Sequence, residues 1–215
     1  MDRFVKTFPA IWDRDLMLCP EHGVAYQLDR SHVINYDADY YGKCLSYEDQ
    51  QIAREINAGR IAIVDKYLGR SAVVDIGIGS GEFIKKRPNT FGFDVNPVAI
   101  EWLKRNDLWA ANLDAFGGYT FWDVIEHVED PGLYLREVQL HARVFISIPL
   151  FDDLDHIRQS KHYRPGEHLY YWTAAGFVMW MDMHGFMLLE RQTFEMDAGR
   201  EDIHTFAFQR NRWPR

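Results

Sequence analysis

The strongest chemical signal in the sequence is a glycine-rich segment, Asp75–Gly81, which reads DIGIGSG and directly follows a short apolar run. Glycines at such a place let the backbone turn sharply and approach a ligand closely, because no Cβ stands in the way. A second acid, Asp94, ends the next apolar run, 17 residues after Gly77. A carboxylate there can accept both hydrogen bonds of a ribose diol. Together these features predict a site for a nucleoside-containing cofactor.

The spacing of the glycines separates two classes of cofactor. A dinucleotide site has the pattern G-x-G-x-x-G, whose last glycine allows a helix to pack closely on a strand. Here that last position is Glu82, and the glycines follow G-x-G-x-G instead. A carboxylate at the mouth of a helix would also repel a pyrophosphate. We therefore expect a cofactor without a phosphate, and a purely structural glycine turn is the alternative.

Two later segments narrow the choice of cofactor. Residues Phe121–Pro131 read FWDVIEHVEDP, and Glu167–Thr173 read EHLYYWT ahead of a Gly-Phe pair at 185–186. With the glycine loop, these segments resemble class I S-adenosylmethionine (SAM)-dependent methyltransferases. They are similar to the D-V-x-E-H-x-x-D-P and H-L-x-x-F-T segments of enzymes related to the ubiquinone-biosynthesis O-methyltransferase, and Tyr36–Tyr41 resembles the tyrosine-rich approach to the core in that group. The motifs are specific for the class and do not name a substrate.

The resemblance implies a set of cofactor contacts, residue by residue. The glycine loop would face the methionine part of SAM, Asp94 would take the ribose hydroxyls, and one of residues 112–114 would meet the adenine amino group. The full set implied is Asp75, Gly77, Ile78, Gly79, Gly81, Asp94, Val95, Asn112, Leu113, Asp114 and Phe121. This sequence departs from the family pattern at 117–120, where F-D-x-x-T is expected, and at Ile78, where a smaller residue is usual. The first departure weakens the prediction of where the fourth strand begins. The second departure, the larger side chain of Ile78, narrows the expected cofactor pocket.

Methyl transfer to an alcohol, phenol or carbon acid also requires a base within hydrogen-bond reach of the acceptor. The candidates are His127 and His168, because each stands at a motif position near the carboxyl ends of the expected strands, where α/β proteins bind ligands. The alternative is that His127 ties a helix start to the sheet and His168 fixes a loop.

A metal site is the next candidate. Asp123, Glu126 and His127 have i, i+3, i+4 spacing, which gathers them on one face if the segment is helical. In the ubiquinone branch a similar cluster is associated with a divalent cation, and oxygen-rich ligands suit Mg²⁺. Short acidic turns are more often solvated or capping, so we assign no metal from the sequence.

Two other segments remain open at this stage. Cys19 and His22 resemble half of a zinc ribbon, but Cys44 stands alone and a structural zinc needs four ligands, so an ordinary turn is favoured. The polar segment 152–164 follows an apolar run and contains acids, histidines and bases. It predicts either a substrate lid, which cofactor and substrate would protect from protease, or a solvated surface loop.

The elements that must position these residues alternate between strands and helices, which indicates βαβ units and a largely parallel sheet. Apolar runs predict strands at 72–76, 90–94, 109–113, 119–122 and 143–149, with a closing antiparallel pair at 187–190 and 204–209. Helices are expected over 46–68, with Gly59 as an interruption, from 82 to 86, and from the cap-and-proline pairs at 96–97 and 130–131. A last helix is expected from Thr173 to Gly185. We expect a Rossmann-like α/β fold with a seven-stranded mixed sheet and helices on both faces. Residues 1–45 form an irregular, aromatic-rich cap and residues 46–215 the methyltransferase domain.

Composition sets the remaining limits. The chain has 215 residues, 47% hydrophobic and 15% aromatic, with 32 acidic against 24 basic residues. The net charge of −8 disfavours nucleic acid, because phosphates are held by an excess of Lys and Arg. Two cysteines, no apolar leader and no long apolar run predict a cytoplasmic protein without a membrane span.

The sequence thus predicts an enzyme that transfers a methyl group from SAM to the oxygen or carbon of a small-molecule acceptor. A catalytically silent SAM-binding partner protein and a nicotinamide-dependent oxidoreductase are the alternatives. The acceptor and the oligomeric state are not predicted.

Overall fold

The main sheet contains both parallel and antiparallel strands. The computed structural model describes residues 11–13, 15–19, 21–28, 37, 41–42 and 51–214, and the expectations for Tyr36, Cys44 and Ser46 fall outside them. The strands of the main sheet follow one another as β5-β4-β6-β7-β10-β9. Their bounds are Val73–Ile76 (β4), Thr90–Phe93 (β5), Gly118–Trp122 (β6), Arg143–Pro149 (β7), Phe186–Gln192 (β9) and Ile203–Arg210 (β10). The first four run parallel, and β10 is antiparallel to both β7 and β9.

The α/β class, the mixed sheet and the antiparallel edge are confirmed, but the sheet has six strands, one fewer than expected. The segment expected as a strand at 109–113 makes a single bridge, Trp109 to Gly92. Asp107 adopts a positive φ of 57° at the end of the preceding helix, and the chain then leaves the sheet through a turn in which the Asn112 side chain accepts from the Asp114 amide. The turn leaves too few residues to pair with β5.

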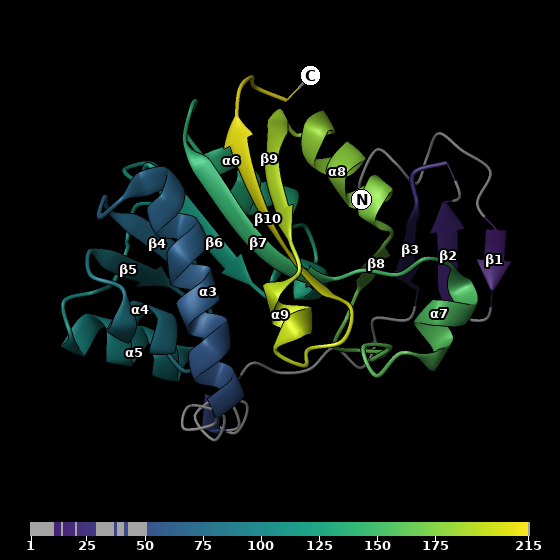
Figure 1. Cartoon of the computed structure of the whole chain (residues 1–215), viewed down its shortest axis with the longest axis horizontal. Coiled ribbons are helices and arrows are strands. Elements are labelled where there is room, and N and C mark those ends of the chain that lie inside the picture. The colour runs from purple at the N-terminus through teal and green to yellow at the C-terminus, as the bar shows by residue number, and fades with distance from the viewer. Residues whose placement is uncertain are drawn as a thin grey trace.

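Helices cover both faces of this sheet, as Figure 1 shows. They are Gln51–Leu68 (α3), Glu82–Lys86 (α4), Pro97–Arg105 (α5), Gly132–Glu137 (α6), Leu154–Gln159 (α7), Ala174–Met183 (α8) and Phe194–Asp197 (α9). The sheet residues alternate between the faces, as the pleat requires. Val74 and Ile146 pack with Leu135 of α6 and Phe177 of α8, whereas neighbouring strand residues pack with Val64 of α3.

The local helix signals of the sequence work as expected at two caps, with two exceptions. Asn96 accepts a hydrogen bond from the Val98 amide and Thr173 from the Gly176 amide, so both cap the helices that follow them. The first exception is Asp130, because α6 begins at Gly132 after Pro131 without any side-chain cap. The second exception is Gly59, which does not interrupt α3. A Cβ there would lie 2.4 Å from the ring of Phe194, so this glycine allows α9 to approach the helix closely.

A second, smaller sheet lies beside the first, at the right of Figure 1, and has the order β1-β2-β3-β8. Its strands are Ile11–Asp13 (β1), Leu16–Cys19 (β2), Val24–Gln27 (β3) and Tyr170–Trp172 (β8). The expectation that the N-terminal residues are irregular is therefore wrong for the strands β1, β2 and β3. Strand β8 pairs with β3 in the small sheet and also makes a bridge from Trp172 to Leu150, which follows β7 of the large sheet. No alternation of apolar and polar residues predicted β2 and β3, because the side chains on both faces of these strands are buried or partly buried.

Among the residues that the structure describes, no helix combines the length and the apolar character needed to cross a membrane.

Candidate functional site

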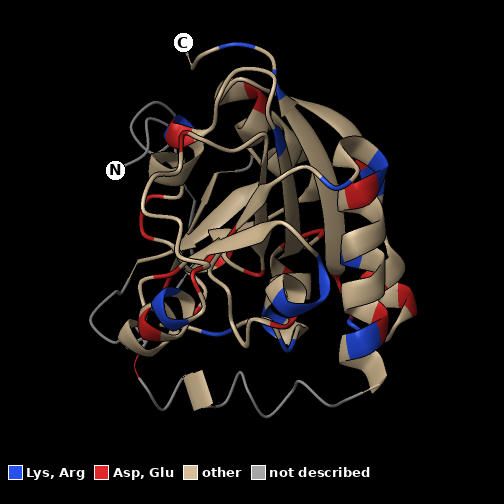
Figure 2. Ribbon diagram, turned by 90° about the vertical axis from the view of Figure 1, so that its left-hand side faces the viewer, with Lys and Arg blue, Asp and Glu red and all other residues tan. Residues whose placement is uncertain are grey.

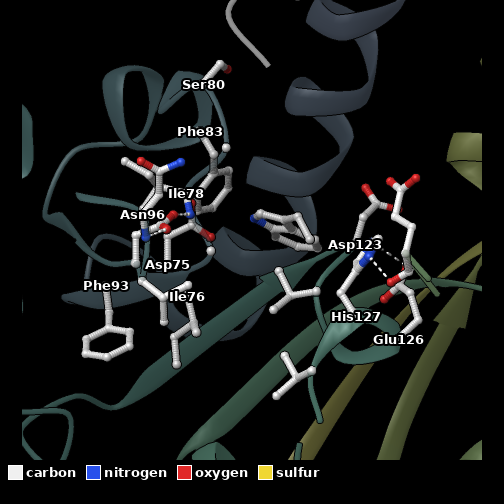
Figure 3. A pocket seen from close by; sticks show the side chains of 18 of the residues that line it. Asp75, Ile76, Ile78, Ser80, Phe83, Phe93, Asn96, Asp123, Glu126 and His127 are labelled. Atoms are coloured by element: carbon white, nitrogen blue, oxygen red, sulfur yellow. Dashed lines mark hydrogen bonds and ion pairs between the residues drawn. The ribbon is translucent and has the colours of Figure 1, made fainter. Parts of the chain in front are cut away.

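A cavity of about 590 Å³ opens at the carboxyl ends of β4, β5 and β6. Loops meet there because parallel strands end at one edge of a sheet, which is where open α/β sheets bind ligands. Figure 3 shows two groups of side chains facing this space. Asp75, Ile78 and Asn96 lie on one side, and Asp123, Glu126 and His127 lie on the other.

The glycine loop after β4 is bent as the sequence predicted. Gly77 and Gly79 have φ of 73° and 53°, values that side chains with a Cβ rarely adopt. A Cβ at Gly77 would lie 2.7 Å from Val124, so that glycine allows the loop to pack on the segment after β6. A Cβ at Gly79 would meet no atom within 4 Å, because this residue borders the cavity. The loop therefore presents bare backbone to whatever fills the cavity.

Asp94 joins the loop to the end of β5. Its carboxylate accepts the amide of Ile78 at 2.9 Å and the amide of Asn96 at 2.8 Å. Burial raises the pKa of Asp94, while these backbone donors oppose the shift. Val95 beside it is 60% exposed, an apolar side chain at the cavity wall. An acid next to an exposed apolar surface is suited to a ribose with its attached base.

Asp75 lies deeper in the same wall, at the end of β4. It accepts a hydrogen bond of 2.6 Å from the Thr120 hydroxyl of β6. Burial raises the pKa of Asp75 to about 7, against the effect of Thr120. This carboxyl group is therefore easily protonated when the cavity holds no cation, and a ligand ammonium would favour its charged form.

The remaining expected cofactor residues do not border the cavity. Gly81 has φ of 78° and caps the start of α4, and a Cβ there would lie 3.3 Å from the Trp102 ring. Phe121 is fully buried in β6 and packs in the core. The residues expected at the adenine, Asn112, Leu113 and Asp114, lie in the turn before β6, and their roles stay predictions.

The opposite end of the cavity holds a buried acid and two histidines. Glu126 and His127 belong to a short 3₁₀ turn, Ile125–His127, after β6. His168 lies two residues before the first residue of β8. The two segments are tied together because the Leu169 amide donates to the Glu126 carbonyl at 2.7 Å. The imidazole rings of His127 and His168 are perpendicular, with centroids 4.6 Å apart. The structure thus brings together the two histidines that the sequence singled out.

Burial controls the protonation of this cluster. It lowers the pKa of His127, against the effect of the Glu167 carbonyl, and with help from His127 it lowers the pKa of His168 to about 2. Burial and the nearby Asp123 raise the pKa of Glu126 well above its usual range. Both imidazoles are therefore neutral at physiological pH, and each offers a ring-nitrogen lone pair to a ligand.

Asp123 has a different role from the one considered in the sequence. It adopts a positive φ of 57°, and both of its oxygens are bound by arginines. Arg60 of α3 contacts one oxygen at 2.9 Å, and Arg200 contacts both at 2.9 and 3.0 Å. These arginines hold the pKa of Asp123 below its usual range in spite of burial. Asp123 is thus an anchor for two cations, and the acid–acid–histidine set considered for a metal does not form.

Three of the residues in this network were missed by sequence reasoning. Arg60, Glu195 and Arg200 come from α3, α9 and the turn after α9, and they share the ion pairs that surround Asp123. Glu195 also accepts a hydrogen bond from Thr205 of β10. No local pattern links positions 60 and 195, so the sequence carried no signal for this network.

The other two candidate segments have ordinary contacts. Cys19 Sγ lies 3.0 Å from His22 Nδ1 in the turn between β2 and β3, as a thiol–imidazole pair. The polar segment after β7 contains α7, and His156 of this helix contacts Asp202 at 3.1 Å. His162 and Arg164 of the same segment line the cavity, so the lid function stays a prediction.

Comparisons with known proteins show which family and which solved structures this chain resembles. A family described as "Methyltransferase domain" matches residues 46–191. No match was found among curated proteins. Among solved structures, an N1-methyltransferase from Burkholderia thailandensis, bound to 1,6-didemethyltoxoflavin and S-adenosylhomocysteine, is similar at 15% identity and a TM-score of 0.54. The match covers 81% of this chain and 85% of that one.

Two further solved structures share the fold. The N-methyltransferase NodS from Bradyrhizobium japonicum, in complex with S-adenosylhomocysteine, is 14% identical with a TM-score of 0.55, covering 86% of this chain and all of that one. A putative methyltransferase from Haloferax volcanii, solved with the Trm112 activator, is 11% identical with a TM-score of 0.60, covering 82% and 98%. At these identities the similarity shows the fold alone.

The family match covers more than half of the chain, and it agrees with the glycine loop and Asp94. The expectation of a SAM-dependent methyltransferase is confirmed at the scale of the family. Membership of the ubiquinone-related group within it is not confirmed. The chain therefore belongs to the methyltransferase domain family and is a SAM-dependent methyltransferase.

Proposed function

We propose that this enzyme transfers the methyl group of SAM to the oxygen or carbon of a small-molecule acceptor. The observation that carries the proposal is that a single cavity is lined at one end by the glycine loop and Asp94 and at the other by Glu126, His127 and His168. Cofactor and acceptor must share one space for a direct displacement at the sulfonium methyl.

The cofactor end suits SAM in its shape and charge. Asp94 accepts the ribose hydroxyls, Val95 lies against the adenine, and the methionine part lies along the open face of Gly79. SAM is cationic at its sulfonium and its ammonium group, and the buried carboxyl of Asp75 stands behind the loop. The roles proposed for Asn112, Leu113, Asp114, Gly81 and Phe121 rest on the family resemblance alone.

The acceptor end supplies groups that can act on a proton. Positioning supplies much of the rate of methyl transfer, but a hydroxyl or carbon acid must also lose a proton. His127 and His168 are the residues proposed to act on it, because both are neutral, buried and beside the cavity.

A small molecule is the acceptor that fits this site best. The cavity of about 590 Å³ must hold both SAM and the acceptor, and pockets for small molecules alone typically measure roughly 300–1,000 Å³, so only a small acceptor fits beside the cofactor. Figure 2 shows acidic and basic residues interspersed along the visible helices, and the net charge is −8. The similar enzyme from Burkholderia thailandensis has a small molecule, 1,6-didemethyltoxoflavin, bound. Nucleic acid is therefore a poor candidate.

Finer assignments complete the proposal. We place the enzyme near the ubiquinone-related group because of the segment 121–131, with residues 46–215 as the catalytic unit and 1–45 as an N-terminal cap. The family match begins at residue 46, which supports this boundary. The expected location is the cytoplasm.

The test is binding of the cofactor to the purified chain, measured by calorimetry with SAM, S-adenosylhomocysteine and NAD. We expect both SAM species to bind and NAD not to bind. Asp94→Ala should weaken their binding, because each lost charge-assisted hydrogen bond is worth about 1.5–3 kcal/mol. Glu101→Ala removes the same charge from the exposed surface of α5 and is the control. Binding of NAD alone would contradict the proposal.

A catalytically silent SAM-binding partner protein is the alternative that cofactor binding cannot exclude. It is distinguished by incubating the enzyme with radiolabelled SAM and a panel of small phenols, hydroxy acids and 1,3-dicarbonyl compounds. Transfer of label that His127→Ala abolishes, while S-adenosylhomocysteine still binds, supports an enzyme. Transfer that is unchanged in this variant would remove His127 from the reaction.

A further inference from the structure

Glu126, His127 and His168 offer three ligand atoms that all lie within 4.8 Å of one another. Glu126 and His127 lie in the 3₁₀ turn after β6, and His168 lies in the segment before β8. His168 is therefore distant in the sequence from the other two residues, and the three side chains come together only in the folded chain. Atoms bound to one ion by bonds of about 2.1 Å lie roughly 3 to 4 Å apart. Small side-chain rotations would therefore bring the three atoms onto one ion.

Two of these side chains are buried and have polar atoms without a partner. Glu126 is 1% exposed, and its Oε2 has no hydrogen bond among the described residues. His168 is 3% exposed, and its Nδ1 likewise has none. Most buried polar atoms are hydrogen-bonded, because leaving one unpaired is costly. Two such atoms at the same end of one cavity indicate that a ligand completes the site.

The orientation of His127 suits metal binding. Its Nδ1 lies 2.9 Å from the backbone carbonyl of Glu167, and a carbonyl can only accept, so Nδ1 carries the proton. The lone pair of this imidazole is then on Nε2, which lies 3.9 Å from Glu126 Oε1. Histidines that bind metals usually donate their other ring N–H to a carbonyl or a carboxylate in this way.

The neighbouring acid is not part of this group. Both oxygens of Asp123 are bound by Arg60 and Arg200, so this carboxylate is already neutralised by two guanidinium groups and is not counted as a metal ligand. The donor set is therefore two imidazoles and one carboxylate rather than a cluster of oxygens. Imidazole ligands suit Zn²⁺, Fe²⁺, Co²⁺ and Ni²⁺, whereas Mg²⁺ prefers oxygen ligands and water.

We propose that Glu126, His127 and His168 bind one divalent transition-metal ion, with its remaining coordination position facing the cavity. Three protein ligands with an open position are typical of catalytic zinc sites, whereas structural sites are closed by four. The proposal deepens the proposed function and rests on it, because the open position faces the acceptor. An acceptor oxygen on such an ion loses its proton more easily, since the metal acts as a Lewis acid. As ligands of the ion, the histidines would promote loss of this proton to solvent water through the metal, which refines the part proposed for them above.

The experiment measures metal binding directly and needs no known acceptor. The full chain is stripped of metal with a chelator and titrated with Zn²⁺, Co²⁺ and Mg²⁺ by calorimetry, and the Co²⁺ form is examined by absorption spectroscopy. We expect one Zn²⁺ or Co²⁺ per chain, with Mg²⁺ at least 100-fold weaker. Each of E126Q and H168A should lower the affinity for Zn²⁺ at least 100-fold and change the Co²⁺ spectrum.

Matched variants control for the other candidate ligands. His162 lines the same cavity, but its Nε2 lies 2.9 Å from the Glu201 carbonyl, so H162A should leave the affinity for Zn²⁺ within about threefold. All measurements are made in a C19S/C44S background, because the Cys19–His22 pair could otherwise bind zinc.

Binding of S-adenosylhomocysteine is measured for every variant, which separates this inference from the proposed function. Intact cofactor binding without any binding of Zn²⁺ or Co²⁺ would overturn the metal site alone. Zinc binding that E126Q and H168A leave unchanged would also overturn it. Loss of cofactor binding in the unmodified chain would instead overturn the proposed function.

Discussion

At the scale of single residues, Gly79 makes the sharpest prediction. Its φ is 53°, and a Cβ there would meet no protein atom within 4 Å. Gly79→Ala therefore places a methyl group in the space proposed for SAM. We expect the affinity for S-adenosylhomocysteine, measured by calorimetry, to fall by about 1–3 kcal/mol through overpacking against the ligand.

Gly69 is the matched control for this variant. It has nearly the same φ, 55°, equally open surroundings, and a position just after α3, away from the cavity. Gly69→Ala and Gly79→Ala should both lose roughly 1–2 kcal/mol of stability to the left-handed backbone. Only Gly79→Ala should lose cofactor affinity. Equal affinity losses in both would show that strain, and not contact with the ligand, is the cause.

Asp75 predicts how pH affects the stability of the ligand-free protein. Burial raises the pKa of Asp75 to about 7, against about 3.9 in an unfolded chain. Between these values the folded state retains a proton that the unfolded state has lost. The contribution of Asp75 to stability is therefore greatest below pH 4 and falls as the pH rises to about 7.

The measurement is urea-induced unfolding of the protein and of Asp75→Asn from pH 4 to pH 8. Asparagine stays neutral and can still accept the Thr120 hydrogen bond. The variant should match the parent at pH 4 and become progressively more stable than it towards pH 8, by up to about 4 kcal/mol for a shift of three pH units. Parallel stability curves would contradict the raised pKa of Asp75.

At the scale of elements, buried ion pairs fasten α3 and α9 to the turn after β6. Arg60 contacts Glu195 at 2.8 Å and Asp123 at 2.9 Å, and its guanidinium lies 4.9 Å from the centre of the Trp122 ring. Removing Arg60 takes away one of the two arginines that neutralise Asp123 and the fully buried Glu195, and leaves Arg200 to serve both carboxylates. Arg60→Ala should lower the free energy of unfolding by about 3–5 kcal/mol in urea titrations.

The comparison for this variant is a surface ion pair. Arg105 pairs with Glu101 one turn away on α5, and both side chains are mostly exposed. Arg105→Ala should cost only about 0.3–0.5 kcal/mol. If the two arginine variants lost similar stability, the Arg60 network would be no stronger than a solvated pair.

Local signals explain which elements the sequence could predict. The glycines of Gly77–Gly81, the Asn96–Pro97 start of α5 and the Thr173 cap of α8 act within a few residues of themselves, and each has the expected conformation. The strand at 109–113 was wrong because its apolar residues are used otherwise, with Trp109 stacked on Phe93. Hydrophobicity alone does not distinguish a strand from a packed turn.

Long-range contacts explain what the sequence could not predict about the site. The pair of His127 and His168 was expected from motif positions, but the Arg60–Glu195 contact joins residues 135 apart in the chain. Charged residues of this kind usually lie on the surface, so nothing marked them as buried. For the same reason Asp123 was considered as a metal ligand, since its arginine partners lie on distant elements.

At the scale of the whole molecule, the small sheet supports the acceptor end of the cavity. Strand β3 pairs with β8, and the Gln27 amide donates to the Leu169 carbonyl at 2.9 Å, next to His168. The cofactor end instead depends on β4 and β5 of the large sheet. The two ends should therefore respond separately to damage in the small sheet.

Ala25→Pro tests this separation, because Ala25 lies opposite both Leu18 and Tyr171 and proline disrupts an inner strand. We expect hydrogen exchange at Tyr170–Trp172 to increase at least tenfold, while exchange in β4 and affinity for S-adenosylhomocysteine stay within about threefold. Faster exchange in both sheets would show that the molecule unfolds as one cooperative unit.

The pairing of β3 with β8 also has a consequence for biosynthesis. Val24 and Trp172 are direct partners, although 148 positions separate them in the chain. On a ribosome that adds about 5–20 residues per second, β3 is made many seconds before its partner exists. The small sheet and the segment that carries His168 can close only after Trp172 has been made, well after the strands β4 and β5. During synthesis, the wall that receives the acceptor is therefore completed after the wall that receives SAM.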